Sequence, residues 1–136
     1  MDQKMFCYQC EQTAGCTGCT SRGVCGKDAQ TAQAQDRLTG ALIGLARAAD
    51  TSPDAGPETW QLMIEGLFAT LKNVNFDPDS LNALAGRVRA EKQRLVPDCA
   101  VCTAPCGRTG DYDLAQLWGA QEDIRSLKSL LLFGSR

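Results

Sequence analysis

The feature that most constrains this sequence is a run of cysteines near its amino terminus. Five of the eight cysteines fall within the first 25 residues. Four of them form a C-x2-C-x8-C-x5-C pattern, namely Cys7, Cys10, Cys19 and Cys25. The surrounding segment is rich in glycine and poor in large apolar residues, so it has little with which to build a hydrophobic core. Four thiolates on a short loop can instead converge on one soft metal centre, an iron–sulfur cluster or zinc, which would supply the nucleus for folding.

The cysteines are interpreted as reduced thiols. The sequence does not open with a charged segment followed by an apolar one, and no apolar run is long enough to cross a bilayer. We therefore expect a cytoplasmic protein, in which cysteine clusters usually serve metal binding or redox chemistry. A net charge of −2 gives no reason to expect nucleic acid or a membrane as a partner.

Other residue patterns narrow the kind of metal site. The sequence contains no histidine, which excludes Cys2His2 zinc fingers, Rieske centres and Ser-His-Asp triads, and it indicates no catalytic residue. A thioredoxin-like motif at Cys7 and Cys10 would need a βαβ pattern, which is missing. Zinc stays open as an alternative, although the wide gaps between the last three ligands are unlike those of zinc ribbons. The glycines of the loop allow the close backbone approach that an iron–sulfur cluster needs, so the spacing favours a cluster.

Residues 28–136 carry helical patterns. Apolar residues recur at helical spacing over 28–50, and Pro57, the Asp77-Pro78 pair and Asp111 mark the starts of three further helices. No stretch alternates apolar and polar residues as a half-buried strand does. The sequence therefore predicts an all-α fold, a bundle of about four helices with an N-terminal iron–sulfur-binding loop, in which residues 1–27 and 28–136 together form one domain. The apolar faces expected to form its core are Leu38, Leu42, Leu45 and Ala49; Trp60, Ile64, Leu67, Phe68 and Leu71; Leu81, Leu84, Val88 and Leu95; and Leu114, Leu117, Trp118, Ile124, Leu127 and Leu131.

The residues that flank the cysteines carry a family resemblance. The segment 5–14, MFCYQCEQTA, followed by Gly18-Cys19-Thr20 and by the segment 23–27, GVCGK, resembles the amino terminus of the hybrid-cluster proteins, also called prismane proteins or hydroxylamine reductases. Segments 105–113 and 123–130 are similar to the later part of that family's helical first domain. The resemblance implies that the four cysteines of the pattern hold a [4Fe-4S] cluster near the surface. A longer-spaced variant in the family holds a [2Fe-2S] cluster, which is the alternative.

The resemblance also implies what the chain should lack. The family protein is much longer, and its hybrid cluster is bound by His, Glu and Cys residues of two further domains, so the missing histidine agrees with their absence. We therefore expect an electron-transfer domain that works with a redox partner protein or with the missing catalytic domains, as a fragment or a free-standing first domain. The alternatives are a structural or assembly module that docks to a partner or forms a homo-oligomer, and a component of an active hydroxylamine reductase converting NH2OH to NH3.

A second group of cysteines precedes the last expected helix. Cys99, Cys102 and Cys106 form C-x2-C-x3-C, which gives three ligands where a closed tetrahedral site needs four. Cys16 would be the fourth ligand if the two loops meet. Otherwise these cysteines are free or packed thiols, and Cys16 is a spare small residue of the first loop.

Three cationic residues lie near the first cysteine group in sequence. Lys4, Arg22 and Lys27 can partly offset the negative charge of a tetrathiolate cluster, or dock an acidic donor. The plain alternative is that all three are solvated surface charges.

Overall fold

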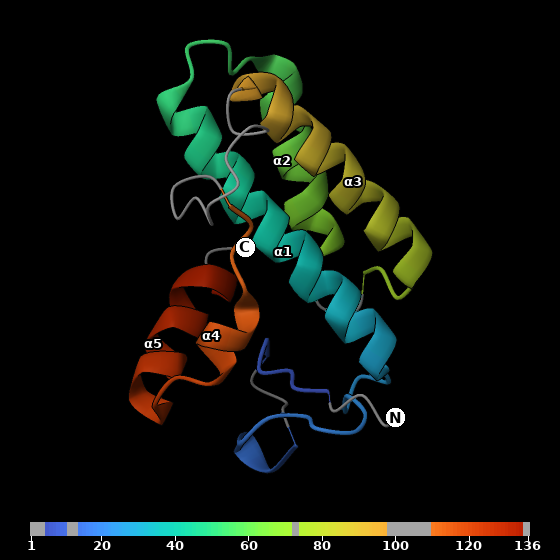
Figure 1. The fold of residues 1–136 in the computed structure, drawn as a ribbon. Coiled ribbons are helices and arrows are strands. Elements are labelled where there is room, and N and C mark those ends of the chain that lie inside the picture. Colours follow the sequence, from blue (N-terminus) through green and yellow to red (C-terminus); the bar gives the residue numbers. More distant parts are fainter. Residues whose placement is uncertain (1–4, 11–13, 72–73, 98–109, 135–136) are drawn as a thin grey trace.

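The architecture rests on three helices that run up, down and up beside one another (Figure 1). The structure, a computed structural model, describes residues 5–10, 14–71, 74–97 and 110–134. Over these residues the elements are a short 3-10 helix η1 (Ala14–Cys16), α1 (Ala29–Thr51), α2 (Pro57–Ala69), α3 (Pro78–Leu95), α4 (Leu114–Trp118) and α5 (Glu122–Phe133). In that part of the chain no named strand forms, so the prediction of an all-α fold is confirmed.

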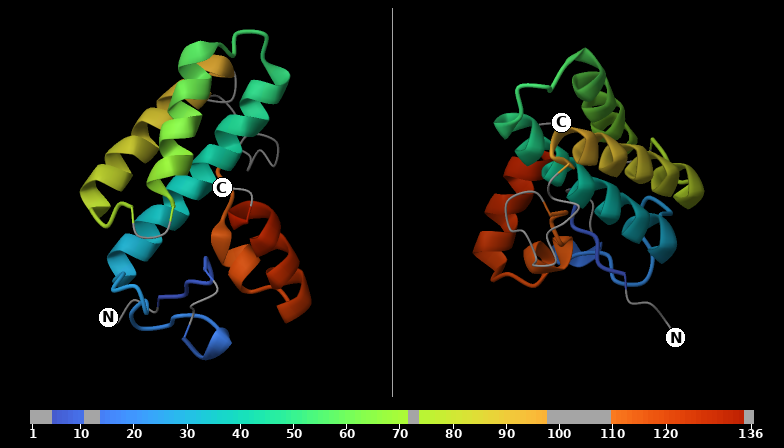
Figure 2. Two further views of the ribbon diagram at one scale, coloured as in Figure 1. Left: turned by 180° about the vertical axis from the view of Figure 1, so that it is seen from behind. Right: turned by 45° about the horizontal axis from the view of Figure 1, so that its top comes forward.

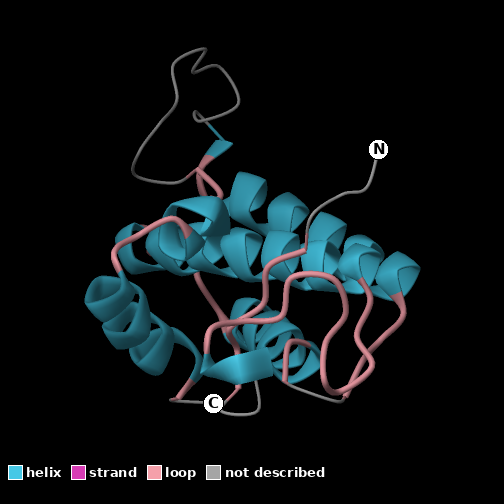
Figure 3. Ribbon diagram, turned by 90° about the horizontal axis from the view of Figure 1, so that it is seen from below, coloured by secondary structure: helices cyan, strands magenta, loops and turns pink. Residues whose placement is uncertain are grey.

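The helices form two groups on either side of α1. Helices α2 and α3 pack on one side of it, and the short pair α4 and α5 lies on the other, as Figure 2 shows from two directions. The N-terminal loop closes the end of the molecule at which α1 begins, and Figure 3 shows this loop from below. None of the described helices combines the length and the apolar character needed to span a bilayer.

Local sequence signals set the helix starts. Asp28 caps α1, because its side chain accepts a hydrogen bond from the Thr31 amide at 2.7 Å. Pro57 is the first residue of α2, where its missing N–H costs nothing. Asp77 caps α3 ahead of Pro78, as the sequence predicted. These three starts are therefore confirmed.

The predicted faces of α1 and α3 form the core between these two helices. Both contribute side chains that are nearly or completely removed from solvent, so the periodicity correctly identified which residues pack inward. The shared core is Leu38, Leu42, Leu45 and Ala49 from α1 with Leu81, Leu84, Val88 and Leu95 from α3.

The predicted inner face of α2 was wrong. Trp60, Ile64 and Phe68 are exposed, Ile64 to 67%. The helix instead turns Thr59, Leu62, Gly66 and Ala69 toward the core. Close packing explains the difference, because a Cβ added at Gly66 would lie 2.6 Å from the Cδ2 of Leu42. Small side chains let α2 approach α1, and its larger apolar side chains are left on the outside.

The single helix predicted from Asp111 is two helices. Asp113, not Asp111, caps α4, accepting from the Ala115 amide at 2.9 Å. Helix α4 ends at Trp118 and is followed by Gly119, a weak helix former. The turn lets α5 fold back, so that the rings of Trp118 and Phe133 stack with centroids 5.8 Å apart. Asp111 pairs instead with Arg89 at 2.6 Å and with Lys92 at 2.5 Å on α3.

The apolar face predicted for the last helical segment is buried in α4 but exposed in α5. Leu114 and Leu117 of α4 are buried as expected, whereas Leu127 and Leu131 of α5 are exposed, Leu131 to 76%. The helix contributes other contacts: Arg125 lies over the rings of Phe6 and Tyr8, with its guanidinium carbon 5.3 Å from each ring centroid. This end of the chain therefore packs on the N-terminal loop through a cation–π contact.

A glycine fixes the approach of the α4 segment to α1. The Tyr112 amide donates to the carbonyl oxygen of Gly40 at 3.1 Å. A Cβ at Gly40 would overlap the carbonyl oxygen of Tyr112, so only glycine lets the two backbones meet here. This contact positions the segment that carries Trp118 toward the N-terminal loop.

Candidate metal centre

Cys7 and Cys19 lie directly opposite each other on two antiparallel stretches of the N-terminal loop. The Cys7 amide donates to the Cys19 carbonyl at 3.0 Å, and the Cys19 amide donates to the Cys7 carbonyl at 2.9 Å. In such a pair the Cα atoms are about 5.5 Å apart and both side chains leave the same face. Both residues are buried. The structure therefore brings together two of the four predicted ligands.

The other two predicted ligands lie nearer the surface. Cys10 and Cys25 are partly exposed, and the described cysteines all carry free thiols. Cys25 packs beside Gly23, where an added Cβ would lie 3.0 Å from its sulfur. Across the parts of the chain that the structure describes, no three cysteine or carboxylate side chains converge as a metal-binding group. The four-ligand set thus stays a prediction.

The second predicted cysteine group is represented by only one described residue. Cys16 is exposed at the end of η1 and has a positive φ of 58°. Cys99, Cys102 and Cys106 lie outside the described residues. A site that joins them to Cys16 therefore stays a prediction.

The surroundings of the two buried sulfurs suit thiolate ligands. The Ala14 amide lies 3.5 Å from the Cys19 sulfur and points toward it as a donor. Burial raises the pKa of Cys7, and a backbone hydrogen bond from Gln9 acts against this rise. Backbone N–H groups aimed at sulfur are typical of iron–sulfur sites, where they also tune the reduction potential. The chemistry of these two sulfur donors and of their surroundings therefore fits such a cluster.

Loop conformation brings these groups together. Gly18 has a φ of 122°, which other residues rarely adopt, and an added Cβ there would lie 2.8 Å from the ring of Phe6. Glycine at this position thus allows the chain to enter the bridge at Cys19 while Phe6 packs against it.

Lys27 is the residue whose role sequence reasoning left most open. It is only 2% exposed, and its ammonium lies 3.9 Å from the Cys7 sulfur and 3.3 Å from the Gln9 side-chain oxygen. Burial raises the pKa of the Cys7 thiol, and the Lys27 ammonium partly opposes this rise. For Lys27 the surface-charge alternative is wrong, whereas Arg22 is exposed as that alternative expected and Lys4 lies outside the described residues.

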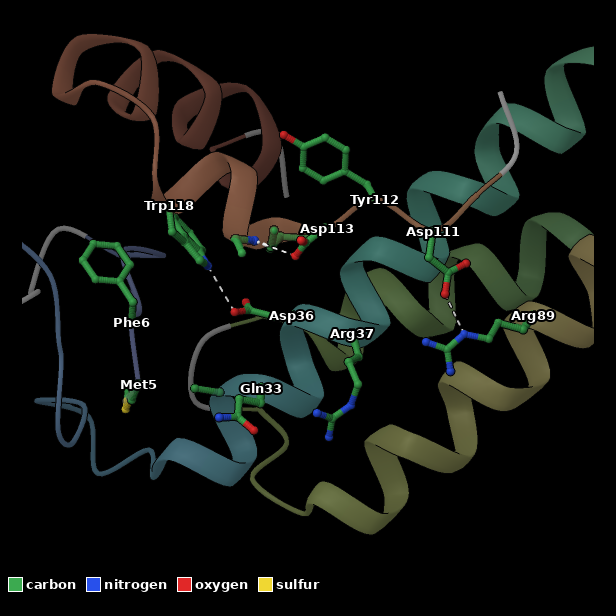
Figure 4. Close-up of a pocket in the computed structure, with 13 residues that line it drawn as sticks. Met5, Phe6, Gln33, Asp36, Arg37, Arg89, Asp111, Tyr112, Asp113 and Trp118 are labelled. Atoms are coloured by element: carbon green, nitrogen blue, oxygen red, sulfur yellow. Dashed lines mark hydrogen bonds and ion pairs between the residues drawn. The ribbon is translucent and has the colours of Figure 1, made fainter. Parts of the chain in front are cut away.

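A half-buried carboxylate interacts electrostatically with this lysine and was not predicted. Asp36 of α1 accepts a hydrogen bond from the indole nitrogen of Trp118 at 3.1 Å (Figure 4). Burial raises the pKa of Asp36 to about 6, while the Trp118 hydrogen bond and the Lys27 charge act in the opposite direction. Sequence gave no signal for this residue, because an acidic residue beside Arg37 in a glutamine-rich helix is usually solvated.

Asp36 and Trp118 lie on one wall of a cavity of about 510 Å³. Figure 4 shows it between the N-terminal stretch, α1, α3 and the segment that leads into α4. Met5 and Phe6 close the end nearest the cysteines, and the ion pair of Arg89 with Asp111 lies at the other end. The cavity thus lies between the ion pair of Arg89 with Asp111 and the cysteine loop.

The raised pKa of Asp36 predicts a pH-dependent stability. The native state holds a proton on Asp36 that the unfolded chain releases, so this residue's contribution to stability falls as the pH rises from about 4 to about 6. In the metal-free protein, Asp36→Asn should remove this fall and raise the free energy of unfolding by up to about 3 kcal/mol above pH 7. Urea unfolding at pH 4.5 and pH 7.5 would measure it.

The matched control for that experiment is Asp50→Asn, which removes an exposed carboxylate from the same helix. We expect the Asp50 variant to keep the pH dependence of the parent protein. Equal pH profiles for both variants would show that Asp36 is not the titrating group.

Taken together, these observations define a cysteine-rich all-α domain with a buried pair of thiols in its first loop. The chain belongs to the Prismane/CO dehydrogenase family, whose model matches residues 5–136. Members of this family bind iron–sulfur clusters.

Three relatives show how much of a longer protein this chain corresponds to. Hydroxylamine reductases from Kosmotoga olearia, Porphyromonas gingivalis and Clostridium perfringens are 35%, 36% and 37% identical to it. The alignments cover 96%, 98% and 96% of this chain, respectively. They cover 28% of each relative, so the chain spans less than a third of their length.

Proposed function

We propose that this chain binds one [4Fe-4S] cluster through Cys7, Cys10, Cys19 and Cys25 and serves as an electron-transfer domain. The observation that carries the proposal is the buried pairing of Cys7 with Cys19, whose sulfurs face backbone N–H donors. Thiolates in such surroundings suit iron–sulfur clusters, and family membership supports the same choice over zinc. When bound, the cluster supplies one-electron chemistry.

The protein's own residues would hold the ligands and set the electrostatics. Burial raises the pKa of Cys7, and the Gln9 amide acts against this rise, while the Ala14 amide donates to the Cys19 sulfur. Cys10 and Cys25 are partly exposed, which leaves one side of the loop open to an electron donor. The free thiols agree with a reducing compartment, which supports a cytoplasmic location.

The same proposal makes this chain the electron-delivering part of a hydroxylamine reductase. The relatives named above are hydroxylamine reductases, and this chain corresponds to less than a third of each. We assign to it the delivery of electrons to a catalytic centre in further domains or on a partner, where hydroxylamine would be reduced to ammonia. The exposed apolar side chains of α2 and α5 support contact with such domains.

The test is metal analysis and reductive titration of the anaerobically purified protein. We expect about four iron atoms per chain, no zinc, and a reversible one-electron change on titration with dithionite. Visible absorption and electron paramagnetic resonance would follow the change. A protein that binds zinc alone would contradict the proposal.

A second candidate function is a structural or assembly module whose cluster is never reduced. The outward-facing Ile64, Phe68 and Leu131 favour it, because a domain with such faces is built to contact other protein. The same titration separates the two candidates. Bound iron that stays in one oxidation state over the accessible range would favour the structural function.

A further inference from the structure

The buried ammonium of Lys27 faces a sulfur, and among the described residues no carboxylate lies within ion-pair distance of it. Burying a charge is costly unless a partner compensates it. The ion pairs formed among the described residues do not include Lys27. Its contacts are the Cys7 sulfur at 3.9 Å and the neutral Gln9 side chain at 3.3 Å. Asp36 interacts with the ammonium electrostatically but forms no ion-pair contact with it. The group in direct contact that can compensate the ammonium is therefore the sulfur, once it carries negative charge.

The backbone fixes Lys27 in this position from both sides. The Gly23 amide donates to the Lys27 carbonyl at 2.7 Å, and the next residue, Asp28, caps α1. These contacts fix the backbone of Lys27, and the side chain, 2% exposed, is enclosed by the loop. The ammonium is thus an internal group of the folded loop and not a surface charge.

We propose that Lys27 sets the reduction potential of the cluster bound by Cys7 and its partner cysteines. The inference rests on the proposed function. Reduction brings in one electron from an external reductant, here dithionite, and adds one negative charge to the cluster with no proton required. A fixed ammonium beside a ligand sulfur favours the more negative state, and its burial protects that interaction from screening by salt. Lys27 therefore raises the potential.

Arg22 provides an internal comparison. It carries the same charge in the same loop, but its side chain is exposed. Water and salt screen an exposed charge, so Arg22 should contribute little to the potential. Removal of the charge at Lys27 should therefore change the reduction potential of the cluster much more than removal of the charge at Arg22.

The experiment compares the reduction potentials of the iron-loaded parent protein and three variants, Lys27→Met, Lys27→Arg and Arg22→Met. For Lys27→Met we expect the ratio of reduced to oxidised cluster at a fixed potential to fall by about tenfold or more, a negative shift of about 59 mV or more. Lys27→Arg should stay near the parent value, because it keeps the charge. Arg22→Met should change the ratio by less than about twofold.

The possible outcomes separate this inference from the proposed function. A parent protein that binds no iron would overturn both. Iron-loaded Lys27→Met and Arg22→Met proteins with the same potential would overturn only the role of Lys27. Loss of iron from Lys27→Met, with helical content retained by circular dichroism, would also overturn it, in favour of a role in cluster assembly. Lys27→Gln repeats the test with a polar neutral side chain if the methionine variant does not fold.

Discussion

Cys19→Ser is expected to abolish iron binding by this protein. Cys19 is buried, faces Cys7 across two backbone hydrogen bonds, and receives the Ala14 amide at its sulfur. Serine offers a hard oxygen that stays protonated, which is a poor substitute for a soft thiolate. The affinity for iron should fall by more than the about 10–100-fold that loss of a hydrogen-bond partner of a ligand typically costs. Little iron should therefore stay bound to the variant. Iron analysis after anaerobic reconstitution measures this.

Cys16→Ser is the matched control for this substitution. Cys16 lies in the same loop, only three positions away, but it is exposed at the end of η1. Its replacement should leave the iron content unchanged. Full iron content in the Cys19 variant would remove this residue from the ligand set, and loss of iron from the Cys16 variant would bring that residue into it.

Gly40→Ala is expected to destabilise the fold by about 3 kcal/mol, the upper end of typical overpacking costs. The new methyl group would overlap the carbonyl oxygen of Tyr112, and this backbone atom can move only if the whole segment before α4 moves. The hydrogen bond from the Tyr112 amide to the Gly40 carbonyl would break with it. Chemical denaturation would report the loss.

The control for the Gly40 substitution is Gly86→Ala. Gly86 is exposed in the middle of α3, and an added Cβ there meets no atom within 4 Å. Alanine should therefore stabilise the protein by about 0.5–1 kcal/mol through helix propensity alone. Opposite signs for the two glycines would establish that the contact at Tyr112, rather than glycine itself, is what matters; equal signs would contradict it.

Sequence periodicity predicted which segments are helical better than which faces of them are buried. The α1 and α3 faces were found because leucine and valine at helical spacing build that core. The α2 face was missed because its contact with α1 depends on the absence of a side chain at Gly66, which no hydrophobic pattern can indicate. The break at Gly119 was missed for a related reason: the apolar pattern continues across it while the backbone turns.

The sequence singled out the two cysteines that the structure pairs, but it did not indicate which charged groups lie around them. Cysteine spacing singled out Cys7 and Cys19 without knowledge of the fold. The burial of Lys27 depends on how the turn after Gly23 meets α1, and Asp36 depends on a tryptophan far along the chain. Local sequence therefore points to the candidate donors, whereas tertiary packing decides which ionisable groups face them.

The hydrogen bond between Trp118 and Asp36 joins positions 82 residues apart. The charges around the cysteines of the first loop therefore depend on a residue near the carboxyl end of the chain as well as on residues near the amino end. A recombination event that kept every cysteine but exchanged the last helices would carry the ligands into a different field. The cysteines keep these surroundings only when the whole domain is transmitted together, because the cysteine motif alone does not determine them.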